Sequence, residues 1–199
     1  MNGPLKNLLV IDLTRVLVGP YCTMILSDLG ARVIKVEAPE IGDDSRNFGP
    51  FIKDYSAYFM SLNRGKESIA LNLKNSEDKK IFDKILSKAD ILVENFKPGT
   101  LEKWGYGWKN INKKNPKLIY ASASGFGQTG PLRELPAYDM VVQGMGGLMS
   151  VTGQPNSEPT RVGTSIGDIT AGLFTAIGIN AALYERQKTG KGMYIDVSM

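Results

Sequence analysis

The chain has 199 residues, of which 42% are hydrophobic and 22% charged, and its net charge is +4. This length suits one α/β domain or part of a larger protein, and lysines interleaved with acids argue against nucleic acid as a partner. The absence of histidine excludes a Ser-His-Asp or Cys-His nucleophile pair and a His-ligated metal site, and the single Cys22 excludes a disulfide within the chain. The apolar run at residues 8–11 is too short for a signal peptide or a membrane span, so we expect a cytoplasmic protein with no membrane partner.

The first elements of the chain form a repeating pattern. Residues 8–13 are an apolar run typical of a buried strand, residues 21–29 predict a helix that starts at Pro20 and stops at Gly30, and residues 32–37 predict a second strand. A strand, a helix and a strand within about thirty residues make a βαβ unit with parallel strands. The unit lacks the Gly-x-Gly-x-x-Gly turn, which disfavours NAD.

The rest of the chain continues in the same way. Further strands are expected at residues 68–73, 90–94, 118–122 and 193–197, and helices at 76–86, near 101 and 110, at 137–149 and from 168 to about 188. Residues 38–57 form a Gly-, Pro- and Asp-rich loop that is longer than a simple connector. These patterns predict an α/β fold, a Rossmann-like open parallel sheet flanked by helices, whose strand order the sequence does not give.

Asp168 is the only charged residue between Arg161 and Glu185, and a run of small and apolar residues follows it. Asp is a preferred helix N-cap, so one interpretation is that its side chain caps the helix. The other is a carboxylate nucleophile, kept ionised by the positive end of the helix and accessible because glycines surround it. The local sequence leaves both open.

Several short motifs follow one another along nearly the whole chain. They are Asp12-Leu13-Thr14, Gly19-Pro20, Leu29-Gly30-Ala31-Arg32-Val33-Ile34-Lys35-Val36-Glu37, Asn63-Arg64-Gly65-Lys66, Val93-Glu94-Asn95-Phe96-Lys97-Pro98-Gly99, Ser124-Gly125-Phe126-Gly127-Gln128-Thr129-Gly130-Pro131 and Ile166-Gly167-Asp168. In this order they resemble the family III CoA-transferases, the formyl-CoA and carnitine CoA-transferase group, whose fold is shared by α-methylacyl-CoA racemase. Each motif is weak alone, and together they are specific.

The resemblance implies that Asp168 is the catalytic aspartate. In such transferases it attacks an acyl-CoA thioester, and CoA passes to an acceptor carboxylic acid through aspartyl anhydride and thioester intermediates. Backbone N–H groups near Gly167 are expected to stabilise the oxyanions. Tyr138 stands where the racemases carry a histidine, and a tyrosine is a poor base at neutral pH, so the resemblance favours a transferase in which Tyr138 donates a hydrogen bond to the acyl group.

The resemblance also implies a set of CoA contacts, namely Val16, Leu17, Val18, Lys74, Asn95, Phe96 and Lys103. Phe96 suits packing on the adenine or pantetheine, and the lysines suit the phosphates as point charges. The chain departs from many relatives at Ala38, where they carry an arginine that meets CoA. Arg46 or Lys97 is the expected substitute.

Relatives continue for roughly as much chain again, so residues 1–199 resemble the N-terminal part of the large α/β domain, without the small second domain and the C-terminal return. The expected partners are an acyl-CoA, a small carboxylic acid and a second copy, because the family forms interlocked homodimers at full length. Two alternatives stay open: an acyl-CoA racemase or lyase of the same fold, and a catalytically incomplete CoA-binding or dimerisation fragment.

Overall fold

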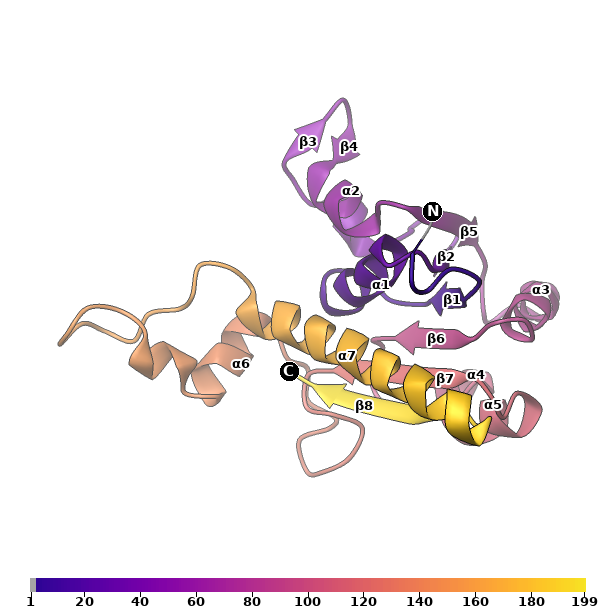
Figure 1. Ribbon diagram of the computed structural model, residues 1–199. Coiled ribbons are helices and arrows are strands. Elements are labelled where there is room, and N and C mark those ends of the chain that lie inside the picture. The colour runs from indigo at the N-terminus through magenta and orange to yellow at the C-terminus, as the bar shows by residue number, and fades with distance from the viewer. Residues whose placement is uncertain (1–2) are drawn as a thin grey trace.

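The computed structural model describes residues 3–199 and has a parallel sheet of six strands at its centre (Figure 1). The order of the strands across the sheet is β5 (Lys66–Ala70), β2 (Arg32–Glu37), β1 (Leu9–Asp12), β6 (Ile91–Glu94), β7 (Ile119–Ser124) and β8 (Tyr194–Ser198). All five neighbouring pairs in this sheet are parallel. The predicted fold class, an open parallel α/β sheet flanked by helices, is confirmed.

Helices cover both faces of this sheet. On one face lie α1 (Val18–Asp28) and α7 (Ile166–Thr189), and on the other α3 (Ser76–Leu86), α4 (Thr100–Trp104) and α5 (Trp108–Lys114). Because side chains alternate along a strand, β1 sends Val10 to the first layer and Ile11 to the second. Both side chains are fully buried, so the strand supports two separate apolar cores.

Two arms project from this centre in Figure 1. One holds the short hairpin of β3 (Phe51–Ile52) and β4 (Tyr55–Ser56) with α2 (Ala57–Asn63), and the other holds α6 (Asp139–Met145) and the 3-10 turn η2 (Leu148–Val151). The long loop predicted at residues 38–57 therefore contains local structure, including a second 3-10 turn, η1 (Asp44–Asn47).

Two predicted boundaries are corrected. The strand expected at residues 68–73 begins and ends earlier, at Lys66–Ala70, because it pairs with β2, whose last residue Glu37 lies opposite Ala70. The helix expected at residues 137–149 stops at Met145, since Gly147 adopts φ 76°, which ends a helix. The helix expected at residues 76–86 has these bounds, and its cap is Asn75, whose side chain accepts the Glu77 N–H at 2.8 Å.

The long helix α7 packs closely on α1. A Cβ atom on Gly172 would lie 2.7 Å from the Val18 carbonyl oxygen, so only glycine permits this approach of the two backbones. The helix has the length and hydropathy of a membrane-spanning segment, and its packing against the sheet accounts for the apolar residues on its inner face. It ends at Thr189, close to the predicted end at about residue 188, and the φ of 69° at the following Gly190 suits a C-terminal glycine.

Candidate functional site

The candidate site lies at the edge of the sheet where the parallel strands end. A helix that connects two parallel strands runs antiparallel to them, so the N-termini of α1 and α7 and the loops after β1, β2 and β6 all meet at this edge. Val18 at the start of α1 packs with Ala171 of α7, which joins the two helix N-termini.

Asp168 is the third residue of α7 and does not cap it. The N-cap position belongs to Ser165, and the first turn is capped from α6, where the Asp139 Oδ1 accepts the Gly167 N–H at 2.7 Å and the Asp168 N–H at 3.4 Å. The N-cap interpretation of Asp168 is therefore wrong. Within residues 3–199 the Asp168 carboxylate takes part in no hydrogen bond or ion pair, which leaves it free to react.

The surroundings of Asp168 make its carboxylate more basic. Partial burial, and after it the negative charge of Asp139, raise the pKa of Asp168 to about 6. A carboxylate with this pKa is still mostly ionised at neutral pH and is a stronger nucleophile than an ordinary one. The expected stabilisation by the helix end is offset, because Asp139 already occupies that end.

Two tyrosines belong to this region. Burial, and then the charges of Asp168 and Asp43, raise the pKa of Tyr58 in α2, so its phenol stays protonated and able to donate a hydrogen bond. No motif in the sequence pointed to Tyr58. Tyr138 stands directly before α6, next to the capping Asp139, and is 79% exposed, so it is no core aromatic.

A cavity of about 510 Å³ opens at the same edge of the sheet. Its walls come from the ends of β1 and β2, the segment 38–43, the segment 71–74 and the aromatic rings of Phe96 and Trp104. Of the predicted CoA contacts, Lys74 and Phe96 line it. Lys103 is exposed on α4 and is not among the lining residues.

Asn95 holds the backbone of Arg15, one of the residues that line this cavity. Its side chain accepts the Arg15 N–H at 2.9 Å and donates to the Arg15 carbonyl at 2.8 Å, a reciprocal pair across eighty positions of the chain. The next residue, Val16, has φ 68°, which is strained for a β-branched residue, and its N–H donates to Asp43 Oδ1 at 3.1 Å. The predicted residues Val16 and Asn95 therefore fix the loop after β1, whereas Leu17 and Val18 lead into α1.

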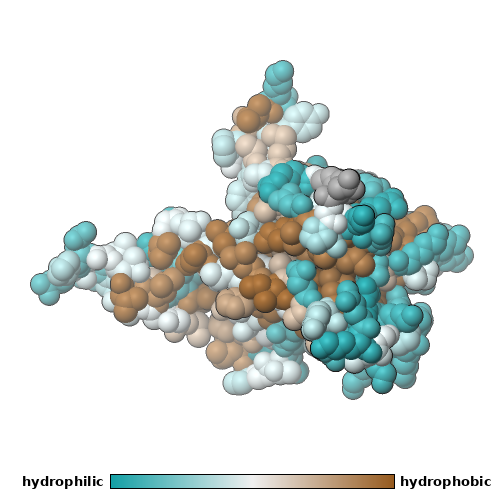
Figure 2. Space-filling model, viewed as in Figure 1, coloured by the Kyte–Doolittle hydropathy of each residue, from teal (hydrophilic) through white to brown (hydrophobic). Residues whose placement is uncertain are grey.

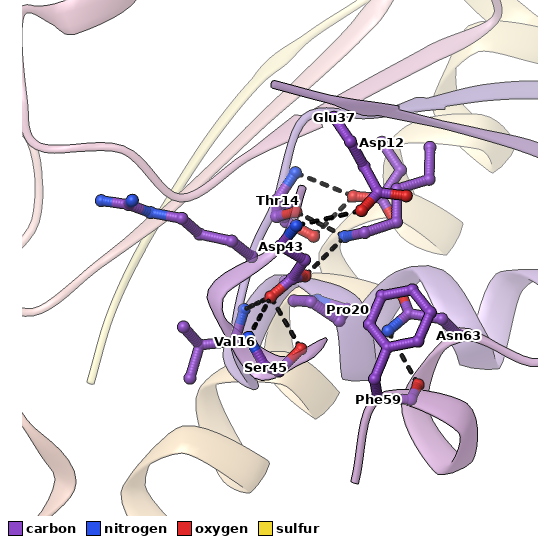
Figure 3. Close-up of polar contacts among 12 residues, drawn as sticks. Asp12, Thr14, Val16, Pro20, Glu37, Asp43, Ser45, Phe59 and Asn63 are labelled. Atoms are coloured by element: carbon purple, nitrogen blue, oxygen red, sulfur yellow. Dashed lines mark hydrogen bonds and ion pairs between the residues drawn. The ribbon is translucent and has the colours of Figure 1, made fainter. Parts of the chain in front are cut away.

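Figure 3 shows the buried polar network beneath this loop. Lys35 is 1% exposed, pairs with the equally buried Asp43 at 2.8 Å and donates to the Thr14 carbonyl at 2.7 Å. Lys66 pairs with Asp12 at 3.0 Å, both of them buried. Burial opposes the charge on each carboxylate, yet the neighbouring lysines and hydrogen bonds hold the pKa of Asp12 and of Asp43 below its usual range.

The two residues expected to replace the missing arginine are already engaged. Arg46 donates to both carboxylate oxygens of Glu37 at 2.7 Å, and its guanidinium lies 3.8 Å from the centre of the Phe59 ring. Lys97 pairs with Glu134 at 3.7 Å, with both side chains exposed. Ala38, which stands at the position of that arginine, lines the cavity.

Comparison with known proteins identifies relatives along the whole chain. The family model for CoA-transferase family III matches residues 5–199. The acetyl-CoA:oxalate CoA-transferase of Acetobacter aceti is 57% identical over 100% of this chain and 51% of its own length, and the succinyl-CoA:glutarate CoA-transferase of Homo sapiens is 45% identical over 98% and 45%. A crystal structure of a CAIB/BAIF family protein from Brucella suis covers 100% of this chain and 53% of its own, with 44% identity and a TM-score of 0.95. The chain thus spans about half the length of the curated relatives it matches.

Proposed function

This chain belongs to CoA-transferase family III, and we propose that the protein moves CoA from an acyl-CoA thioester to a carboxylic acid with Asp168 as the nucleophile. The observation that carries the proposal is the state of Asp168. Its carboxylate is half-buried at a helix N-terminus, has a raised pKa and makes no hydrogen bond within residues 3–199. It lies at the same edge of the sheet as the cavity beside Phe96.

The chemistry needs one carboxylate used repeatedly. Asp168 attacks the thioester carbon, the C–S bond breaks, and CoA leaves as a thiolate from an acyl–aspartyl anhydride. The thiolate then attacks the aspartyl carbonyl, which releases the donor as a carboxylate and leaves an aspartyl-CoA thioester. The acceptor carboxylate attacks that thioester and forms a second anhydride with release of the thiolate. Attack of the thiolate on the acceptor acyl carbon gives the new acyl-CoA and returns Asp168.

Each of these steps passes through an oxyanion that needs hydrogen-bond donors. The Gly167 N–H, which the sequence pointed to, already donates to Asp139 at 2.7 Å and is therefore not free for this task. Tyr58 carries a protonated phenol within electrostatic range of Asp168. We assign the donor role to Tyr58, and to Tyr138 a hydrogen bond to the bound acyl group, because its exposed hydroxyl stands next to the residue that caps α7.

The cavity is the proposed place for part of the CoA molecule. Its aromatic wall at Phe96 and Trp104 suits the adenine or the pantetheine, and Lys74 at its rim suits a phosphate. The proposed CoA set keeps Val16, Leu17, Val18 and Asn95 as the residues that form the loop beside it, and Lys103 as a more distant phosphate contact.

Replacing Phe96 or Lys74 with alanine should raise KM for acyl-CoA about 3- to 30-fold and leave kcat nearly unchanged, since each contact binds substrate and transition state alike. Lys103→Ala is the matched lysine control and should change KM less than Lys74→Ala. Initial rates against acyl-CoA concentration measure both. An equal change of KM in Lys74→Ala and Lys103→Ala would contradict the proposal that the CoA phosphates bind at this cavity.

The substrates are proposed from the names of the relatives. Relatives act on oxalate, mesaconate and glutarate, each a dicarboxylic acid, with acetyl-CoA or succinyl-CoA as donors. We therefore propose a small dicarboxylic acid as the acceptor. Acetyl-CoA and succinyl-CoA, each mixed with these three acids and the protein, should yield the acceptor's CoA ester by liquid chromatography and mass spectrometry. CoA binding without any exchange would favour the incomplete CoA-binding fragment, and epimerisation of a 2-methylacyl-CoA would favour the racemase.

A cytoplasmic homodimer, interlocked at full length, is the proposed assembly. Apolar side chains gather over the arm that holds α6 and over the adjoining part of α7 (Figure 2). Phe174 and Ile177 of α7 and Met145 of α6 are each more than 60% exposed, an unusual amount of apolar surface for a monomer. Analytical ultracentrifugation of the protein at the full length that its gene encodes should give twice the chain mass, and the mass of one chain would contradict the proposal.

A further inference from the structure

The contact between α6 and α7 is built from side chains that serve the first turn of α7. Asp139 Oδ1 accepts the N–H groups of Gly167 and Asp168 at 2.7 and 3.4 Å. Its other oxygen, Oδ2, accepts a hydrogen bond from the Gln143 side-chain amide at 2.6 Å. Residues four apart lie on one face of a helix, so α6 presents Asp139 and Gln143 together.

Gln143 extends the contact to the segment before α7. Its side chain is 2% exposed, and its Oε1 accepts the Val162 N–H at 2.8 Å. Its amide nitrogen also lies 3.4 Å from the carbonyl oxygens of Val162 and Thr164. Gln143 thus holds the backbone before the turn that leads into Asp168, and Asp139 holds the backbone after it.

The residue before Asp168 fits this arrangement. A Cβ atom on Gly167 would lie 3.1 Å from Asp139 Oδ1 and 3.3 Å from Val142 Cγ1, tighter than ordinary contacts. A glycine at this position therefore lets the carboxylate of α6 reach the backbone of α7.

We propose that Asp139 is a positioning residue for the reaction of Asp168, held in place by Gln143. The inference rests on the proposed CoA-transfer function. Asp139 touches the backbone of the nucleophile and not the substrate. It fixes the direction of the Asp168 side chain, and it takes up the N–H groups of the helix end that would otherwise stabilise the carboxylate and weaken it as a nucleophile.

The charge of Asp139 has a second consequence. It raises the pKa of Asp168, which makes the attacking oxygen more basic. Tyr58 from α2 also faces Asp168, and because burial and the charge of Asp168 raise the pKa of Tyr58, its phenol stays protonated and adds no charge beside Asp168. Without the charge at position 139, the acidic limb of the pH–rate profile should move to lower pH.

Asp139→Asn tests the proposal in the protein at the full length that its gene encodes. Asparagine retains an acceptor for the Gly167 N–H and loses the charge. We expect kcat to fall about 10- to 100-fold with KM within about threefold of the wild type, and the acidic limb to move to lower pH. Glu134→Gln, which removes an exposed acid on the loop before α6, is the control. It should leave kcat and the acidic limb of the pH–rate profile unchanged.

In Asp139→Asn the asparagine NH₂ group faces the NH₂ group of Gln143, and two donors in contact could impair folding. A second variant separates this effect from the loss of charge. Asp139→Asn with Gln143→Glu restores the donor and acceptor match between these two side chains, gives up the 3.4 Å contacts of the Gln143 amide with the Val162 and Thr164 carbonyls, and places the charge one turn further along α6. This double variant should fold like the wild type, and the acidic limb of its pH–rate profile should stay at the lower pH expected for Asp139→Asn. An unshifted limb in a folded variant, with either normal kcat or an equal loss at every pH, would overturn the proposal. Absence of CoA transfer in the wild type would instead refute the proposed function.

Discussion

Asp168→Asn is expected to lower kcat for CoA transfer on the order of 10⁴-fold or more, because the amide cannot form the anhydride on which every step depends. Asparagine has nearly the same shape, and within residues 3–199 no hydrogen bond to the carboxylate is lost. Substrate binding should therefore persist, with KM for acyl-CoA close to that of the wild type.

The same substitution should make the protein slightly more stable. The pKa of Asp168 is raised to about 6 in the folded chain, above the ordinary 3.8, so its ionised form favours unfolding and stability falls as the pH rises between these values. The neutral amide removes that cost at pH 7. Urea unfolding of both proteins at pH 7 and at pH 4 measures the difference, which should be smaller at pH 4.

Activity of the wild type should rise as the pH rises through about 6, since only ionised Asp168 attacks. A variant Asp168→Asn that keeps more than roughly one per cent of the wild-type rate would show that another group is the nucleophile. Tyr138→Phe provides a comparison, because it removes a proposed hydrogen bond to the acyl group and no covalent step, and its loss should be far smaller.

Asp43→Ala should cost about 3–5 kcal/mol of stability, because it leaves the Lys35 ammonium buried without its partner. It also removes the acceptor of the Val16 N–H and of the Ser45 N–H and hydroxyl, which together hold the loops beside the cavity. We therefore expect weaker CoA binding as well as a lower midpoint in urea.

The neighbouring aspartate supplies a matched control. Asp44 pairs with Arg15 at 3.1 Å, but both side chains are about half exposed, so Asp44→Ala should cost no more than about 1 kcal/mol. Adding Lys35→Met to Asp43→Ala removes the orphaned charge and should recover most of the loss. Equal destabilisation by the two aspartate variants would contradict the buried ion pair as the cause.

The alternation of apolar runs was sufficient to predict the parallel sheet and the helices that flank it, because the central strands bury both faces and helices cover each face. The apolar pattern did not predict the strand order or the arms at β3–β4 and α6, since these depend on contacts between distant segments. The only sign of the Lys35–Asp43 ion pair in the sequence is a lysine inside an apolar strand.

For the site, the resemblance supplied Asp168, Tyr138, Lys74 and Phe96, and the periodicity placed the loop after β6 at the right edge of the sheet. The capping role went instead to Asp139, 29 positions away from the residue it caps. A capping aspartate looks the same in sequence whether it serves its own helix or a neighbouring one, so only the fold could distinguish the two. Tyr58 was missed because it belongs to a short helix, α2, that begins where the long loop ends.

The central claim, a covalent intermediate on Asp168, is tested most directly by peptide mass spectrometry. The protein is mixed with acetyl-CoA or succinyl-CoA, trapped with hydroxylamine and digested, with Asp168→Asn treated in the same way. The account predicts a hydroxamate at Asp168 that forms only with acyl-CoA and is absent from the variant. CoA transfer in the wild type with an unmodified Asp168 peptide, or a hydroxamate on another residue, would contradict it.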